Sequence, residues 1–251
     1  MPVLNQLPAR EIYNPVSLPT VSVLSVDALI QLPDFEAAVH TVADHYAFEQ
    51  HPYLQWMQAP TTTRDAFRHS QLSFRFAVES FSQSLAAVLA RILLLEDRLA
   101  LAENVAEEHG HGDRLHAHKY TFRQYLLALG ASPDELTNPC SIAVLAFNQS
   151  ILNFCLTQSA EAGAAALGMI EHLYVPISAA IARTVHERGW TASGSQSHYT
   201  VHEVLDVEHA RDLLAIAAPA WECKTSRLLV AQGLLLGSHY FWTLYHDLPR
   251  F

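Results

Sequence analysis

His202, Asp206 and His209 lie four and three residues apart in a stretch of the sequence with helical character. At about 100° per residue, these steps place the three side chains on one helix face, within roughly 60° of one another. Two imidazoles and a carboxylate suit iron, manganese or zinc, and a helix holds them in fixed relative positions. The spacing therefore predicts one wall of a metal site. The alternative is a solvated helix face that carries polar residues.

A second polar stretch runs from Asn104 to His118 and contains two glutamates, four histidines and two glycines. A carboxylate at the end of one helix, a glycine turn and a histidine opening the next helix would bring ligands from two antiparallel helices to one point. Spacing alone does not decide which of these side chains point inward. A polar turn of this composition is also compatible with simple exposure to solvent.

A third candidate is the pair Glu171 and His172, which interrupts the largely apolar stretch of residues 166–176. Apolar surroundings on most sides predict that one of the two side chains is buried. A buried carboxylate needs a cation or a network of hydrogen bonds. Pairing of the glutamate with an arginine is the alternative to a metal ion.

The elements that must position these residues are predicted to be helices. Prolines at positions 2, 8, 15 and 19 predict an extended arm over residues 1–25. In the rest of the chain, apolar residues recur at helical intervals, capping residues precede these segments and glycines follow several of them. No segment shows the alternation of apolar and polar residues that is typical of a strand. The expected helices cover residues 26–31, 34–50, 63–95, 96–108, 115–129, 138–156, 162–188, a segment that carries His202 and ends near 217, and 221–244. The predicted fold is an all-α bundle of about seven helices, in a single domain over residues 26–251.

Composition narrows the class of protein. Of 251 residues, 50% are hydrophobic and 16% are charged, which predicts a sizeable core and argues against global disorder. A net charge of −10 with only two lysines argues against a nucleic-acid partner. The N-terminus lacks the features of a signal peptide, and the apolar runs are shorter than the roughly 20 residues that cross a bilayer. Three dispersed cysteines fit reduced thiols. We therefore expect a cytoplasmic, soluble protein.

With the three polar groups in this order, the chain resembles the heme-oxygenase-like di-iron oxidases, relatives of the thiaminase-II-like and pyrroloquinoline-quinone-synthase folds. Residues 104–112, followed by His116 and His118, are similar to the family's Asn-x-x-x-Glu-x-Gly-x-Gly turn and its downstream ligand histidine. The helix that carries His202, Asp206 and His209 is similar to the family's His-x3-Asp-x2-His helix, which is the most specific part of the resemblance. The resemblance spans about residues 51 to 245. It implies six metal ligands, which are Glu108, His118, Glu171, His202, Asp206 and His209.

Some members of this family that oxidise nitrogen carry one further carboxylate ligand from the first long core helix. Glu79 is the nearest candidate in this sequence. Members that do not oxidise nitrogen can lack that ligand, so its absence would change the expected reaction and leave the site in place.

The resemblance implies two iron ions, with manganese as an alternative, that bind O2 and oxidise a small organic substrate. The substrate would be an amine, an amino acid or a fatty-acid-like molecule, and the reaction N-oxygenation, C–C cleavage or self-oxidation of the protein. Three carboxylates among the ligands would leave a net charge of roughly +1 with two Fe(II) ions, whereas without metal they would repel one another. The expected partners are O2 and a small-molecule substrate. The sequence leaves open an electron donor and a homodimer, and we expect no membrane or nucleic-acid partner.

Two other functions remain open. A cofactor-free or hydrolytic enzyme of the thiaminase-II-like branch would need a cysteine nucleophile, and neither Cys140 nor Cys155 has an evident activating neighbour in sequence. A non-catalytic metal-binding relative would keep only remnants of the site. The remaining histidines are expected to support ligands or to lie at the surface; these are His109, His111, His116, His172 and His198. Aromatic residues are candidates for a pocket wall or ordinary core, namely Phe74, Phe76, Phe147, Tyr174, Tyr199 and Phe241.

Overall fold

The computed structural model of the protein describes residues 24–191 and 197–250; the side chains of residues 197, 200–206 and 250 lie outside that description. Most of the predicted arm over residues 1–25 therefore falls outside it as well. The described part is helical and contains no strand, which confirms the predicted all-α class. In chain order the helices are α1 (Val26–Leu29), α2 (Phe35–Tyr46), α3 (Pro52–Gln58), α4 (Arg64–Leu89), α5 (Leu95–Glu108), α6 (His118–Ala128), α7 (Ile142–Thr157), α8 (Ala160–Glu187), α9 (Ser197–Ala217) and α10 (Lys224–Asp247).

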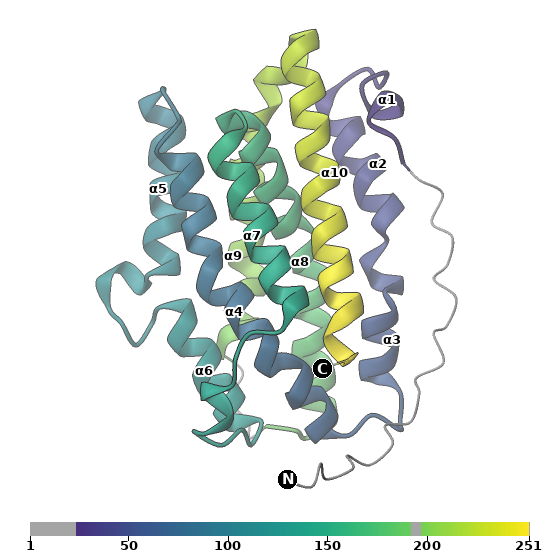
Figure 1. Ribbon diagram of the computed structural model, residues 1–251, viewed down its shortest axis with the longest axis vertical. Helices are drawn as coiled ribbons and strands as arrows, with labels where there is room; N and C mark the ends of the chain where they lie inside the picture. Colours follow the sequence, from purple (N-terminus) through teal and green to yellow (C-terminus); the bar gives the residue numbers. More distant parts are fainter. Residues whose placement is uncertain (1–23, 192–196, 251) are drawn as a thin grey trace, which may run out of the picture.

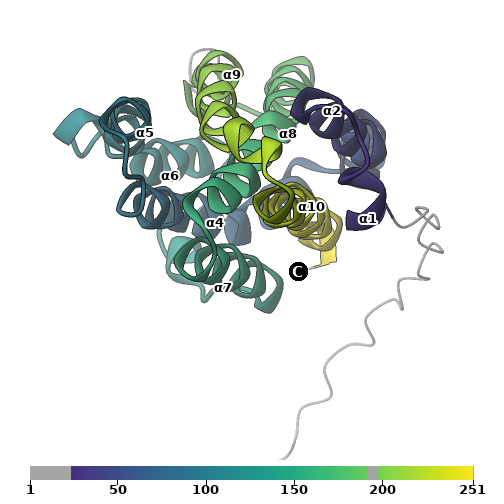
Figure 2. The same ribbon diagram turned by 90° about the horizontal axis from the view of Figure 1, so that it is seen from above.

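The long helices run side by side along the long axis of the molecule (Figure 1). Helix α8 packs against both α9 and α10, and α4 packs against α7 and α6. Seen from above, α5 and α6 lie at one edge of the bundle and α1 and α2 at the opposite edge (Figure 2). Buried apolar side chains from helices at both edges belong to one hydrophobic core. The bundle therefore brings residues that are far apart in sequence around α8.

Side-chain caps explain where several helices begin. The residue before each of four helices accepts a hydrogen bond from the backbone N–H three residues later, which satisfies one of the free donors of the first turn. These caps are Asp34 for α2, Thr63 for α4, Ser141 for α7 and Ser159 for α8. Hydroxyl side chains therefore cap α4, α7 and α8.

Helix α8 forms the centre of the core. It has the length and apolar composition that a membrane span would need, but 78% of that segment is buried inside the bundle. Two glycines of α10 allow α10 to approach it closely. A Cβ atom at Gly233 would lie 2.3 Å from the Ala162 carbonyl oxygen, and one at Gly237 would lie 2.2 Å from the Ala166 carbonyl oxygen. The backbone of α8 is therefore held directly against that of α10.

The structure differs from the predicted elements at several helix boundaries. The expected helix over residues 34–50 ends at Tyr46, and α3, which was not predicted, follows His51. Pro52 occupies the first turn of α3, where its missing N–H costs no hydrogen bond, and the His51 ring caps that turn. Helix α4 ends at Leu89 and not at residue 95, and α6 begins at His118 and not at residue 115. The last difference places His118 at the start of a helix.

Candidate metal centre

Glu108 and His118 face each other across the turn between α5 and α6. Glu108 is the last residue of α5 and His118 the first of α6. The Nδ1 atom of His118 lies 2.8 Å from Oε1 of Glu108, and both side chains are less than 10% exposed. The structure thus brings together the two predicted ligands of this stretch, which lie ten positions apart in the sequence.

Gly110 makes this tight turn possible. Its φ of +62° lies in the left-handed region, and a Cβ atom there would lie 2.5 Å from the backbone nitrogen of Ala117. Any other residue would therefore be strained and would also collide with the backbone that leads into α6. Gly112 has a φ of +87°, but a Cβ atom there would meet nothing within 4 Å.

These two glycines allow a matched test of the turn. We expect Gly110→Ala to destabilise the protein by about 2 kcal/mol or more, because it adds a backbone collision to the 1–2 kcal/mol of left-handed strain. Gly112→Ala should cost only the roughly 1–2 kcal/mol of left-handed strain, because its Cβ atom would meet nothing within 4 Å. Metal affinity should fall in the first variant, since the Glu108 and His118 side chains move apart. Thermal unfolding and metal titration measure both effects, and equal losses in the two variants would contradict this reading of the turn.

Glu171 lies on α8 and is 4% exposed. Together with Glu108, His118 and His198, it lines a cavity of about 50 Å³. The other lining residues are apolar or aromatic, and these are Phe74, Ala77, Val78, Phe81, Phe147, Ile170, Tyr174 and Phe241. Four of the six aromatic candidates from the sequence therefore belong to the wall, while Phe76 and Tyr199 are not among the described lining residues. No arginine is among the described lining residues either, so the expected alternative of a glutamate–arginine pair finds no support here.

His209 brings α9 to the same site. Its side chain is 6% exposed, and its Nδ1 atom lies 3.9 Å from Oε1 of Glu171. That Nδ1 atom is buried and has no hydrogen-bond partner among the described residues. The other ring nitrogen, Nε2, contacts the carboxylate of Glu107 on α5. Glu171 and His209 are thus brought together as predicted.

His202 and Asp206 lie on α9 between His198 and His209. Their side chains fall outside the described part of the structure, so their role as ligands stays a prediction. Glu79, the candidate for an extra ligand, forms an ion pair with Lys119, whose Nζ atom lies 3.1 Å from its Oε2 atom. Glu79 is not among the described residues that line the cavity.

Two residues near the cavity were not predicted as part of the site. His198 is 2% exposed and lines the cavity, and its Nδ1 atom lies 3.0 Å from the Thr121 hydroxyl. It precedes His202 by four residues, so the helical spacing that singled out His202 could also have found it. Glu107, next to a predicted ligand, contacts His209. Of the other leftover histidines, those at positions 109, 111 and 116 are exposed, as expected for a surface role.

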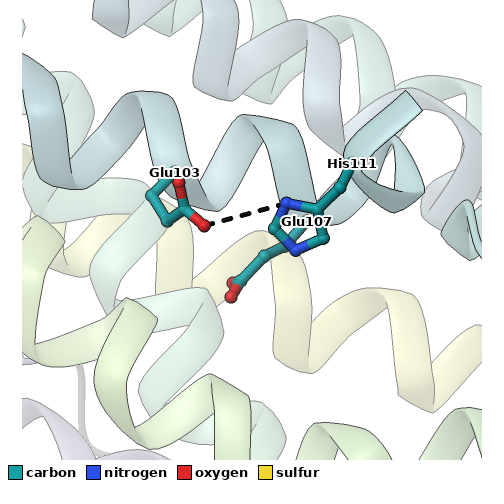
Figure 3. A group of neighbouring side chains, drawn as sticks. All are labelled: Glu103, Glu107 and His111. Atoms are coloured by element: carbon teal, nitrogen blue, oxygen red, sulfur yellow. Dashed lines mark ion pairs between the residues drawn. The ribbon is translucent and has the colours of Figure 1, made fainter. Parts of the chain in front are cut away.

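A further group of potential ligands lies on the outer side of α5. Ligand atoms of Glu103, Glu107 and His111 lie within 4.8 Å of one another. Figure 3 shows Glu103 paired with His111, whose side chains are 66% and 59% exposed. Exposed charges of this kind are well solvated without a metal ion. The buried residues around the cavity are therefore the stronger candidate for a metal centre.

Comparison with known families identifies the class of protein. Residues 68–240, well over half of the chain, match the family described as iron-containing redox enzymes. The chain belongs to this family.

Two relatives of this chain share one name with each other. The chain is 27% identical over 202 residues to a 4-aminobenzoate synthase of Chlamydia trachomatis, a match that covers 79% of this chain and 85% of the relative. It is 28% identical over 171 residues to a 4-aminobenzoate synthase of Chlamydia muridarum, covering 66% of this chain and 70% of the relative. These names indicate an enzyme of the oxidoreductase type.

Solved structures show the fold. A TenA homologue from Pseudomonas syringae has a TM-score of 0.71 at 14% identity, covering 91% of this chain and 98% of that one. A CADD-like protein of unknown function from Nostoc punctiforme has a TM-score of 0.67 at 13% identity, covering 86% of this chain and 93% of that one. A domain with a heme-oxygenase-like fold has a TM-score of 0.68 at 13% identity, covering 90% of this chain and 93% of that one. The predicted heme-oxygenase-like bundle is confirmed.

The buried residues fit the iron that the family implies. Nitrogen and carboxylate oxygen are ligand types that iron accepts. The Nδ1 atom of His209 is buried without a hydrogen-bond partner among the described residues, and a metal ion would satisfy it. Glu108 and Glu171 place two carboxylates, and His118 and His198 two imidazoles, at one largely apolar cavity. A cation is the simplest partner for this set of groups.

Proposed function

We propose that this iron-containing redox enzyme is a non-heme di-iron oxidase or oxygenase that uses O2 to oxidise a small organic substrate. The observation that carries the proposal is the buried Nδ1 atom of His209, which has no hydrogen-bond partner among the described residues and lies 3.9 Å from Glu171. Glu171 in turn lines a cavity together with Glu108 and His118. These four residues come from four different helices. Such convergence of acids and imidazoles inside a helical bundle is typical of di-iron carboxylate proteins.

Six residues would hold the two ions. Glu108, His118, Glu171 and His209 are the described ones, and His202 and Asp206 complete the set as proposed ligands from α9. When bound, two irons would supply the activation of O2 and the oxidising power of the reaction. Manganese is an alternative because it accepts the same ligands.

The walls of the cavity determine which substrate can be oxidised. Phenyl rings from α4, α7 and α10, together with Tyr174, surround the polar groups and keep bulk water away. No lysine or arginine is among the described lining residues, so the protein itself offers no cationic side chain there for a substrate carboxylate. We therefore favour a small, mostly apolar or aromatic substrate. 4-Aminobenzoate, which gives the chlamydial relatives their name, is an aromatic amine that also carries a carboxylate, and in this cavity a bound metal ion would neutralise that carboxylate.

Metal analysis combined with O2 exposure tests the proposal. Protein produced with iron supplementation should contain about two irons per chain, and its anaerobic Fe(II) form should consume O2. His118→Ala should lower both quantities while the protein remains helical. Wild-type protein that binds no iron or manganese after anaerobic reconstitution would contradict the proposal. Protein that binds metal and leaves O2 untouched with every small amine, amino acid or fatty acid tried would favour a non-catalytic relative.

The cysteines give little support to the hydrolytic alternative. Burial raises the pKa of the Cys155 thiol to about 12 and also raises the pKa of the Cys140 thiol, so both resist forming the nucleophilic thiolate. Hydrogen bonds from backbone N–H groups at the start of α10 lower the pKa of Cys223, which is exposed. No cysteine is among the described residues that line the cavity. Metal-free protein that cleaves a thiamin-like compound would restore this alternative.

A further inference from the structure

Glu107 has no role in the ligand set described above, although it is next to Glu108 in sequence. Consecutive residues of a helix point about 100° apart, so the two carboxylates leave α5 in different directions. Glu108 reaches His118, while the Glu107 carboxylate contacts Nε2 of His209 on α9. Figure 3 shows Glu107 beside the ion pair between Glu103 and His111, of which it is not a member. Glu107 therefore connects α5 to a histidine of the candidate metal centre.

This contact determines which nitrogen of the His209 ring carries the proton. An ionised carboxylate only accepts hydrogen bonds, so Nε2 must donate its N–H to Glu107. A metal ion binds a ring nitrogen through its lone pair, so an N–H held at Nε2 by Glu107 leaves Nδ1 as the nitrogen that can bind an ion. The Nδ1 atom is buried, has no hydrogen-bond partner among the described residues, and lies 3.9 Å from Oε1 of Glu171.

We propose that Glu107 is a positioning residue that fixes the tautomer and the ring orientation of His209, so that Nδ1 is presented to an ion shared with Glu171. This inference rests on the proposed metal centre. A carboxylate that accepts the second N–H of a ligand histidine also makes the other nitrogen a stronger donor, and removal of such a carboxylate typically weakens metal affinity 10-fold to 100-fold. The paired glutamates at the end of α5 then have separate roles, Glu108 as a ligand and Glu107 as the support of another.

Two variants of the same helix give a matched comparison. Glu107→Gln and Glu103→Gln each remove one negative charge from the outer side of α5, but the Glu103 side chain is 66% exposed and pairs with His111. Anaerobic titration with Fe(II) or Mn(II) should show an affinity for one ion about 10-fold to 100-fold weaker in Glu107→Gln and unchanged in Glu103→Gln. Both variants should still bind two ions at saturating metal.

A second readout needs no metal. Nitrogen-15 NMR of the metal-free protein, with the His209 signals assigned by their absence in His209→Asn, reports which ring nitrogen carries the proton. We expect the Nε2–H form in the wild type and in Glu103→Gln. In Glu107→Gln that preference should be lost, because the amide can donate as well as accept. A purely structural role of Glu107 would leave this signature unchanged.

The outcomes separate this inference from the proposed function. Wild-type protein that binds no metal would overturn the proposed function, whereas the NMR measurement would still decide the role of Glu107. A Glu107→Gln variant with wild-type affinity, or a wild-type protein with the proton on Nδ1, would overturn the positioning role. A saturating stoichiometry that falls from two ions to one would also overturn it, because Glu107 would then be a ligand itself. If Glu107→Gln does not fold, Glu107→Ser serves in the same comparison.

Discussion

Replacing Glu171 with glutamine is expected to remove at least one metal ion per chain and to lower the rate of O2-dependent turnover by about 100-fold or more. The side chain keeps its size but loses its charge, at a position that is 4% exposed and next to the bare Nδ1 atom of His209. Metal content after reconstitution and the rate of O2 consumption measure the two losses. The increase in melting temperature that bound metal gives to the wild type should shrink as well, because a ligand stabilises only the state that binds it.

The melting temperature of the metal-free protein distinguishes this loss from misfolding. Glutamine has nearly the same volume as glutamate, so the metal-free form of Glu171→Gln should fold and keep a melting temperature close to that of the metal-free wild type. Glu187→Gln, at the exposed end of the same helix, is the control and should keep wild-type metal content. Full metal content in Glu171→Gln would count against the assignment of this residue as a ligand.

Gly237→Ala is expected to destabilise the fold by about 3 kcal/mol or more, at or above the upper end of the usual range for overpacking. The new Cβ atom would lie 2.2 Å from the carbonyl oxygen of Ala166 and 2.9 Å from its Cα atom. Neither atom can move without a shift of the α8 backbone. For a protein of this size the melting temperature should fall by roughly 6–12 °C. Metal affinity should fall too, since Glu171 lies on the displaced helix.

Gly168→Ala provides the comparison for this prediction. A Cβ atom at position 168 would lie 2.9 Å from Cγ of Leu214, a side chain that can rotate or shift. We therefore expect a smaller loss of stability than in Gly237→Ala, measured by thermal or denaturant unfolding. Equal losses in the two variants would show that α8 and α10 can separate easily, contrary to the direct backbone contact described above.

The sequence was sufficient to predict the all-α class. It also led to six proposed metal ligands, and the structure describes the side chains of four of them. Glu108 and His118 were assigned through the family resemblance, because spacing alone leaves open which side chains of residues 104–118 point inward. Glu171 could be predicted because a carboxylate within an apolar helix needs a partner. His209 followed from spacing along one helix.

The residues that were missed depend on contacts between helices. Spacing along α5 could not decide whether Glu107 or Glu108 points inward, because this depends on how α5 is rotated about its axis against α9. His198 has the right spacing for the same face as His202, yet its burial depends on α6, which supplies Thr121. Helix α3 was missed because Pro52 was interpreted as a break, although proline is well suited to the first turn of a helix.

The size of the cavity has a consequence for how the enzyme would work. About 50 Å³ is enough for a few water molecules or for O2, whereas benzene occupies an engineered cavity of about 150 Å³ in another protein. A six-membered ring therefore needs more room than this cavity offers, so a cyclic substrate would bind only after wall side chains such as Phe81 or Phe147 move. Entry of such a substrate and release of its product would then depend on motions of the helices that carry these side chains.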